Sequence, residues 1–234
     1  MTNMQELFLP VMWLQETGHK AYLVGNQSRN AYLGLSSKNQ DVDITTSAST
    51  SEVEAILKQN RIVPIKVNAK FGVVTFEWKK VEYEVATFRE DIYDPQFDHI
   101  RRTPLEVIFH KQPTKDAVRR DFTVNAIYWN PKTNRFLDPT KGIKDLDNKI
   151  LRFIGDPNLR IKEDPVRVLR AVRFKYSLGL KYAPTTKNAL VRHGRLVHKL
   201  QPSLLKSEFN KIHNLKAYQS AKRDMQSFGV VLIV

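Results

Sequence analysis

The stretch QDVDITT (residues 40–46) combines a strand-forming pattern with two aspartates, a residue type that strands disfavour. Val42 and Ile44 are apolar and β-branched, and Asp41 and Asp43 alternate with them. Because side chains two positions apart leave the same face of a strand, the two carboxylates are expected to stand side by side. Like charges that close repel unless a cation lies between them. The stretch therefore predicts a divalent cation, most simply Mg²⁺, held by both carboxylates and by substrate phosphates.

Two other interpretations fit part of this pattern. A calcium-binding loop also begins Asp-x-Asp and ends in a glutamate at its twelfth position, which is Glu52 here. Its sixth position needs glycine for a sharp turn, and this chain has Thr46 there. An exposed strand with two solvated aspartates is the plainer alternative, and the stretch alone leaves it open.

The preceding segment, AYLVGNQSRNAYLG (21–34), predicts a place for phosphates beside that cation. A strand leads into Gly25, and a helix is expected to follow as far as Gly34. Glycine permits a tight turn with close backbone approach, and the amides at a helix start attract phosphate. Arg29 would add a charge-assisted contact. Taken alone, a strand–glycine–helix junction indicates little.

The composition favours a soluble globular protein with an anionic partner. Of 234 residues, 41% are hydrophobic and none is cysteine, which excludes disulfides and thiolate metal sites and is compatible with the cytoplasm. The net charge of +14 favours nucleic acid, nucleotides or an anionic membrane surface, with a merely basic enzyme as the plain alternative. No apolar run approaches the ~20 residues that span a bilayer. The N-terminus predicts an amphipathic helix interrupted near Pro10, not a signal peptide.

The pattern of the chain changes once, which predicts an α+β part followed by a helical part. A helix is expected over SEVEAILKQN (51–60), and a hairpin is expected to turn at Lys79 and Lys80. The predicted strands are KAYLVG (20–25), DVDITT (41–46), RIVPIKV (61–67), GVVTFEW (72–78) and VEYEVATF (81–88). Helices are expected over PVRVLRAVRFKYSLGL (165–180), TTKNALVRHGRLVHKL (185–200) and a stretch from about Ser203 to Phe228.

Taken in order, these stretches resemble the head of the class II tRNA nucleotidyltransferases, the CCA-adding enzymes, and their sister family, the bacterial poly(A) polymerases. The family pattern is Val-Gly-Gly-x-Val-Arg-Asp-x-Leu-Leu-Gly followed by Asp-x-Asp. The resemblance covers roughly residues 20 to 200 and is strongest to bacterial CCA-adding enzymes of the Bacillus/Lactobacillus type. Later segments that fit it are EVATFRED (84–91), RRDFTVNAIYW (119–129), LDPTKGIKDLDNKILRFIGDP (137–157) and EDPVRVLRAVRF (163–174).

The resemblance implies an α+β nucleotidyltransferase head with a small mixed β-sheet over 1–150 and an all-helical neck over 151–234. It implies attack of a tRNA 3′-hydroxyl on the α-phosphate of CTP or ATP, with Mg²⁺ held by Asp41 and Asp43. Poly(A) polymerase is the alternative within the family. No membrane partner is implied, the expected location is the cytoplasm, and the oligomeric state stays open, with a homodimer as one alternative.

Nucleotide binding is implied at Gly25, Asn26 and Arg29 and at the motif VRRDFTVNA. There Arg120 would contact the sugar or phosphates of the incoming nucleotide, and Asp121 would fix Arg120 or the ribose. A surface Arg–Asp pair of little energetic value is the structural alternative. Glu84 could be a third acid near the metals, but a solvent-facing strand glutamate fits equally, and Glu84 is not assigned a catalytic role.

The motif EDPVRVLRAVRF implies nucleotide selection by Asp164, Arg167, Arg170 and Arg173. Adenine and cytosine both present an amino donor beside a ring-nitrogen acceptor, whereas guanine and uracil present the reverse. A carboxylate at Asp164 and a guanidinium at Arg167 would therefore accept ATP and CTP and reject GTP and UTP. The alternatives are a helix cap at Asp164 and a solvated arginine face.

The chain departs from the family pattern in two respects. Asn26, Ser28 and Asn30 replace the second glycine, the valine and the aspartate of the first motif. Asparagine tolerates a left-handed φ better than most residues, so the turn is expected to form. The chain also ends in FGVVLIV, where related enzymes continue into a body and tail. This predicts a shortened enzyme with weak, salt-sensitive tRNA binding, or an inactive RNA- or nucleotide-binding remnant.

Overall fold

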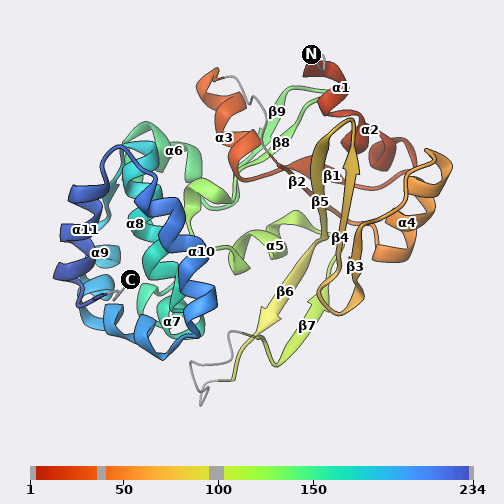
Figure 1. The fold of residues 1–234 in the computed structure, drawn as a ribbon. Coiled ribbons are helices and arrows are strands. Elements are labelled where there is room, and N and C mark those ends of the chain that lie inside the picture. Colours follow the sequence, from red (N-terminus) through yellow and green to blue (C-terminus); the bar gives the residue numbers. More distant parts are fainter. Residues whose placement is uncertain (1–3, 36–40, 95–102, 232–234) are drawn as a thin grey trace. The chain divides into compact units, whose positions relative to one another are not determined.

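The structure, a computed structural model, describes residues 4–35, 41–94 and 103–231 (Figure 1). Its contacts divide the chain into two compact units, and each is described by itself. The first unit comprises Met1–Ile92, Glu106–Arg120 and Asn125–Gly142. The second unit comprises Tyr93–Leu105, Asp121–Val124 and Ile143–Val234.

A mixed sheet of 7 strands organises the first unit, in the order β3-β4-β5-β2-β1-β8-β9. Strands β2 and β5 pair in parallel, while the other neighbours pair antiparallel. The strands are β1 (Ala21–Leu23), β2 (Val42–Thr46), β3 (Lys66–Asn68), β4 (Val73–Trp78), β5 (Val81–Thr87), β8 (Tyr128–Asn130) and β9 (Arg135–Leu137). A separate antiparallel pair is formed by β6 (Arg89–Ile92) and β7 (Glu106–Phe109).

One face of this sheet is the hydrophobic core of the first unit. Val42 and Ile44 of β2 are 0% and 1% exposed, and Val74 and Val85 lie in the same buried cluster. Helices α2 and α4 cover this face, since their buried residues belong to that cluster (Figure 1). The helical elements here are α1 (Met4–Leu7), α2 (Leu9–Glu16), α3 (Asn26–Leu33), α4 (Thr50–Gln59), η1 (Ala69–Phe71) and α5 (Pro113–Arg119). Because side chains alternate along a strand, the next residues of each strand lie on the opposite face, here called the open face.

The hairpin of β4 and β5 confirms the predicted turn. Lys79 and Lys80 adopt φ values of 51° and 63°, and Trp78 pairs with Val81. Two consecutive residues with positive φ match the right-handed twist of the flanking strands. Helix α4 begins with a capping box in which Ser49 accepts from the Glu52 amide, so its start is also fixed locally.

The ends of two predicted elements can be compared with the structure, and one of them was wrong. The predicted strand over 61–67 begins only at Lys66, because Pro64 lacks an amide hydrogen and only Ile65 donates to Thr75 before the ladder starts. The N-terminal helix is interrupted near Pro10, as predicted, and the break falls at Phe8 between α1 and α2. Pro10 lies in the first turn of α2, where a missing amide hydrogen costs nothing.

The second unit is mainly helical. A short parallel pair, β10 (Ile150–Leu151) and β11 (Lys181–Tyr182), accompanies its helices. The helical elements are α6 (Gly142–Asp147), α7 (Pro157–Glu163), α8 (Val166–Leu178), α9 (Pro184–His193), η3 (Gly194–Lys199), α10 (Pro202–His213) and α11 (Tyr218–Ser227). The short helix η2 (Thr123–Asn125) lies at the boundary between the units. None of the helices within the described ranges is both long and apolar enough to cross a membrane.

Candidate active site

Asp41 and Asp43 lie on the open face of the central sheet. Val42 and Ile44 are buried in the core, while Asp41, immediately before β2, and Asp43, within it, are exposed. The alternation of burial therefore directs both aspartates away from the core, as the spacing predicted.

A third carboxylate, Glu84, is the register partner of Asp43. Strand β5 runs parallel to β2 and sets Glu84 beside Asp43 on the open face, where Glu84 is also exposed. The pKa of Asp43 is raised to about 6, first by desolvation and then by the charge of Glu84, with a smaller effect of Asp41. Arg120 and Arg29 oppose this rise. The three acids thus form a concentrated negative site, and the sequence alone had left Glu84 unassigned.

The turn at Gly25 passes directly over this acidic site. Gly25 has φ 69° and ψ −124°, and a Cβ built on it would lie 3.1 Å from Oδ2 of Asp43. The amide of Val24 donates to the carbonyl of Asp43 at 3.1 Å, which holds the turn against β2. The positive φ belongs to Gly25, while Asn26 begins α3 without one. The tolerance of asparagine for left-handed φ is therefore not needed for this turn.

The first turns of α3 bury polar side chains, which is unusual for a helix near a surface. Gln27 is 1% exposed and Ser28 is 0% exposed, and their side-chain polar atoms have no hydrogen-bond partner among the described residues. Buried polar groups normally have partners, and exceptions occur at functional sites. Arg29 is 5% exposed and donates to Oδ1 of Asn125. The glycine turn and α3 therefore place a fixed arginine near the acids.

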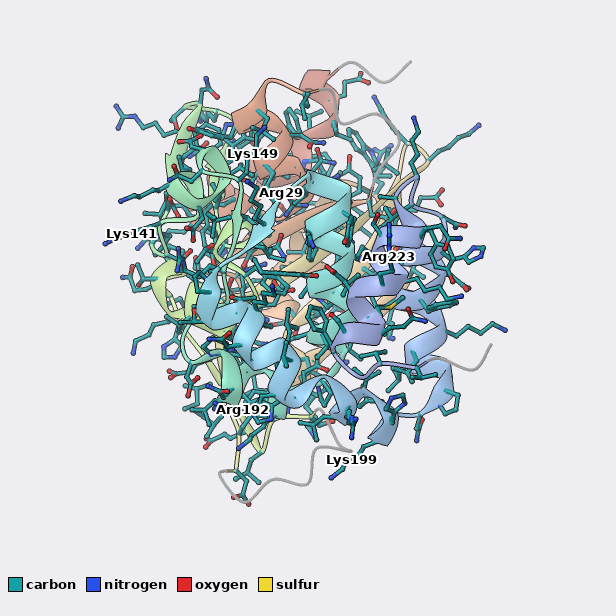
Figure 2. All side chains as sticks on the ribbon, turned by 90° about the vertical axis from the view of Figure 1, so that its left-hand side faces the viewer. Arg29, Lys141, Lys149, Arg192, Lys199 and Arg223 are labelled. Carbon is teal, nitrogen blue, oxygen red and sulfur yellow. The ribbon has the colours of Figure 1, made fainter. Side chains whose placement is uncertain are left out.

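Arg29 is buried, whereas many other basic side chains of the protein are exposed. Figure 2 labels exposed basic residues whose side chains extend from the ribbon, in contrast to the buried Arg29. These exposed residues are Lys141, Lys149, Arg192, Lys199 and Arg223. Arg29 is thus a buried cation, and its charge lowers the pKa of Asp43.

Arg120 is anchored by a buried carboxylate that the sequence analysis missed. Asp116 is 0% exposed, and its Oδ2 accepts from Arg120 at 2.8 Å and from the Tyr128 hydroxyl at 2.8 Å. Arg119 donates to its other oxygen at 2.7 Å. Burial alone would raise the pKa of Asp116, but Arg120 and Arg119 hold it well below its usual range. The spacing of Asp116 and Arg120, four residues apart in a helix pattern, was the available signal.

Asp121 lies in the second unit, where it accepts hydrogen bonds from other groups. Its Oδ2 accepts from Arg170 at 2.7 Å, and its Oδ1 accepts from the Phe122 amide at 2.8 Å. The sequence predicted that Asp121 would fix Arg120 or a ribose. The structure shows Arg120 held by Asp116, and the role of Asp121 toward Arg120 or a ribose stays a prediction.

Asp164 and Arg167 flank the start of α8. Oδ1 of Asp164 accepts from the Val166 amide at 3.1 Å, as a helix cap does, although α8 begins at Val166 and Pro165 is at its N-cap position. Arg167 is 7% exposed and donates to Glu163 and to the Arg160 carbonyl, both at 2.8 Å. These contacts fix the guanidinium close to the helix start.

Arg170 and Arg173 follow on α8 and reach carboxylates of other segments. Arg173 donates to Oε2 of Glu208 at 2.8 Å, and Arg170 lies 3.9 Å from Oε1 of the same residue. Glu208 is on α10 and is 7% exposed. Arg170 also pairs with Asp121. These ion pairs join α8 to α10 and to the segment of Asp121 within the second unit. The arginine face is therefore not a solvated one.

The donor set of the acidic site suits Mg²⁺. Carboxylate oxygens are the protein ligands that Mg²⁺ prefers, usually one or two of them together with water and substrate phosphates. Asp41 and Asp43 supply such oxygens, and Gly25 leaves space directly beside Asp43. Among residues 4–35, 41–94 and 103–231, no cluster of three or more His, Asp or Glu side chains meets the geometry of an all-protein metal site.

A mixed sheet that carries paired aspartates beside a strand–glycine–helix turn defines the head of a nucleotidyltransferase. Residues 21–152 match the family described as Poly A polymerase head domain. The CCA-adding enzyme of Anoxybacillus flavithermus is 37% identical over 199 residues, which are 85% of this chain and 47% of that protein. The chain belongs to this family of poly(A) polymerases and CCA-adding tRNA nucleotidyltransferases, and it spans about half the length of the curated relatives it matches.

Solved structures agree with this assignment. The structure of the Bacillus stearothermophilus CCA-adding enzyme in complex with CTP superposes with a TM-score of 0.83 at 31% identity, covering 97% of this chain and 52% of that one. The Thermotoga maritima CCA-adding enzyme complexed with tRNA gives 0.77 at 26% identity, covering 98% and 52%. The predicted family and the predicted fold class, an α+β nucleotidyltransferase head with a mixed sheet, are confirmed. The predicted domain boundaries and site residues stay predictions.

Proposed function

We propose that this protein is a CCA-adding tRNA nucleotidyltransferase that transfers C and A from CTP and ATP to a tRNA 3′ end in the cytoplasm. The observation that carries the proposal is the acidic site itself. Asp43, Asp41 and Glu84 stand on one open sheet face, directly beside the Gly25 turn. Desolvation and then the neighbouring carboxylates raise the pKa of Asp43, and this concentration of carboxylates favours a bound cation there.

In the proposed reaction the tRNA 3′-oxygen bonds to the α-phosphorus of the nucleotide, and the bond from that phosphorus to the β-phosphate oxygen breaks. Pyrophosphate leaves and the hydroxyl proton passes to solvent. Asp41 and Asp43 would hold Mg²⁺, which when bound neutralises phosphate charge and eases deprotonation of the hydroxyl. Arg29 and Arg120 would bind the nucleotide phosphates, and the Gly25 turn would let the backbone approach them.

Asp164 and Arg167 would select the base. The carboxylate of Asp164 would accept from the amino group that adenine and cytosine share, and Arg167 would donate to their ring nitrogen. Two observations support this assignment: Asp164 is fixed as a helix cap, and Arg167 is fixed by Glu163 and the Arg160 carbonyl. A donor–acceptor pair held in place rejects the reversed pattern of guanine and uracil, because mismatched polar groups stay unpaired.

Nucleotide addition to a tRNA lacking its 3′ CCA tests the proposal. Incorporation of labelled CTP and ATP that stops after CCA is the expected result. A homopolymer of A would identify a poly(A) polymerase instead, the alternative favoured by the family description of residues 21–152. Binding of nucleotide without incorporation would indicate a non-catalytic nucleotide-binding protein.

Competition binding tests the selection of the base. ATP and CTP are expected to bind at least about tenfold more tightly than GTP and UTP, a difference of ~1.4 kcal/mol. Asp164→Asn is expected to reduce this preference, because an amide both donates and accepts. Arg192→Ala, at an exposed position of α9, is the control and should leave the preference unchanged. Equal affinity of the wild type for ATP and GTP would contradict the assignment.

A further inference from the structure

One row of side chains crosses four neighbouring strands on the open face. Asp43 pairs in register with Glu84, Glu84 with Thr75, and Thr75 with Lys66. Register partners present their side chains on the same face of a sheet. Since neighbouring strands lie ~4.8 Å apart, the Cα atoms of Lys66 and Asp43 are separated by about 14 Å. The row therefore begins at the acidic site and ends at a lysine.

A polar cavity of about 270 Å³ lies along this row. Its lining includes Lys66 and Asn68 of β3, Thr75 of β4, Glu84 of β5 and Arg89 of β6. Glu84 thus belongs both to the wall of this cavity and to the acidic site beside Asp43. A cavity of this volume lies near the lower limit of small-molecule sites, which suits one nucleotide better than a whole nucleoside triphosphate.

The cavity is lined by two basic residues, Arg89 and Lys66, which differ in how firmly their side chains are held. Arg89 donates to Oδ1 of Asp91 at 2.9 Å and to the Phe71 carbonyl, and its side chain is 13% exposed. Its guanidinium is therefore fixed as part of the wall. Lys66 is exposed and forms no ion pair within the part of the chain that the structure describes. Lys66 is the cation that an incoming phosphate can reach.

The order of the strands separates this cavity from the Gly25 turn. The sheet runs β3-β4-β5-β2-β1, so Lys66 on β3 and Gly25, which follows β1, lie on opposite sides of Asp43 on β2. In a displacement at phosphorus the attacking and leaving oxygens lie roughly in line on opposite sides. If the triphosphate occupies the side of Gly25 and Arg29, the attacking hydroxyl must approach from the side of Glu84 and the cavity.

We propose that this cavity binds the 3′-terminal nucleotide of the RNA acceptor, with its backbone phosphate at Lys66 and its 3′-hydroxyl directed past Glu84 toward Asp43. The inference rests on the proposed function and adds the place of the second substrate. Lys66 is a positioning residue in this arrangement, because it contacts the acceptor strand and not the reacting atoms. Thr75, between Lys66 and Glu84 in the row, lines the path between them.

A binding experiment with matched lysine variants tests the inference. An RNA hairpin with a single-stranded 3′ end is titrated with wild type, Lys66→Ala and Lys58→Ala. Lys58 is exposed in the last turn of α4, the helix that covers the core face, and its loss removes the same charge. Lys66→Ala should weaken binding roughly fivefold and lower the salt dependence by about 0.7 in slope, as loss of one single-strand phosphate contact does.

Three further measurements make the result specific. A hairpin that lacks the single-stranded 3′ end should bind Lys66→Ala and wild type equally, because the contact is to the terminal strand. CTP affinity should be the same in all three proteins. In steady-state kinetics Lys66→Ala should raise the KM for RNA roughly fivefold and leave the KM for CTP unchanged.

Any outcome other than the expected one overturns the inference. The activity of the wild type shows whether the proposed function fails as well. If wild type incorporates nucleotides while Lys66→Ala and Lys58→Ala bind the hairpin alike, only the cavity assignment fails. A loss of CTP affinity in Lys66→Ala with RNA affinity intact would assign the cavity to the nucleotide instead. If wild type neither binds the hairpin nor extends it, the proposed function fails and the inference fails with it.

Discussion

Replacing Asp43 by asparagine is expected to lower nucleotide incorporation by at least about a thousandfold, a loss of ~4 kcal/mol in transition-state stabilisation. The change removes one proposed ligand of Mg²⁺ from the centre of the acidic site. It should not lower the melting temperature of the metal-free protein. Asp43 is exposed, and the negative charges of Glu84 and Asp41 repel its carboxylate. Incorporation of labelled CTP into tRNA and a thermal melt in EDTA measure the two effects.

The direction of the stability effect follows from the raised pKa of Asp43. A carboxyl group whose pKa is raised in the folded protein to about 6 binds its proton more tightly there than in the unfolded chain. Its contribution to stability is therefore present at low pH and is lost as the pH rises toward and past 6. Near pH 7 the neutral asparagine avoids this loss, so the variant should melt at the same or a higher temperature.

Glu77→Gln is the matched control for this prediction. Glu77 is an exposed carboxylate on β4, and its register partner Glu82 carries the same charge. The change removes one negative charge from a neighbouring part of the sheet without touching Asp43 or Glu84. Near-normal incorporation by Asp43→Asn in Mg²⁺ would show that the acidic site does not hold the metal.

The local elements of the head were predictable because each is encoded within a few residues. The alternation in 41–46 gave the strand and the direction of both aspartates, and Lys79-Lys80 marked the hairpin turn. Gly25 and Gly34 bounded α3 as predicted, with φ values of 69° and 65°. These features depend on period and on turn chemistry, which the sequence displays directly.

Long-range partners could be named from the sequence only as alternatives, as for Glu84. Glu84 lies beside Asp43 only because β5 pairs in parallel with β2, and that pairing depends on how a helix and a hairpin return the chain. Nothing in the period of either strand fixes their mutual register. The cavity at Lys66 depends on two further registers in the same sheet. The sequence therefore predicted the two aspartates from their local motif and left the role of Glu84 open.

The burial of individual polar residues was the second feature that the sequence could not predict. In the sequence, Asp116 is an ordinary acidic residue in the first turn of a short helix. The helix dipole favours acidic residues at that position. The importance of Asp116 follows from its being 0% exposed between Arg119, Arg120 and Tyr128, which come together only in the folded unit.

Replacing Asp116 by asparagine is expected to destabilise the protein by about 3 kcal/mol at neutral pH, because one partner of a buried ion-pair cluster is removed. The loss leaves Arg119 and Arg120 without the carboxylate to which they donate at 2.7 Å and 2.8 Å. Arg120 would also lose its anchor, so nucleotide binding should weaken together with stability. Chemical denaturation and CTP titration measure the two effects, and Glu54→Gln at an exposed position of α4 is the control.

The pH dependence of this loss distinguishes a charge cluster from simple packing. The pKa of Asp116 is held below its usual range, so the unfolded chain takes up its proton first as the pH falls. The stabilisation is therefore complete above the ordinary aspartate pKa of about 4 and declines progressively below it. The difference in unfolding free energy between wild type and Asp116→Asn should be constant from about pH 5 to 8 and shrink at lower pH. A difference that stays constant down to about pH 3 would show that the charge of Asp116 does not contribute to the stability of the folded protein.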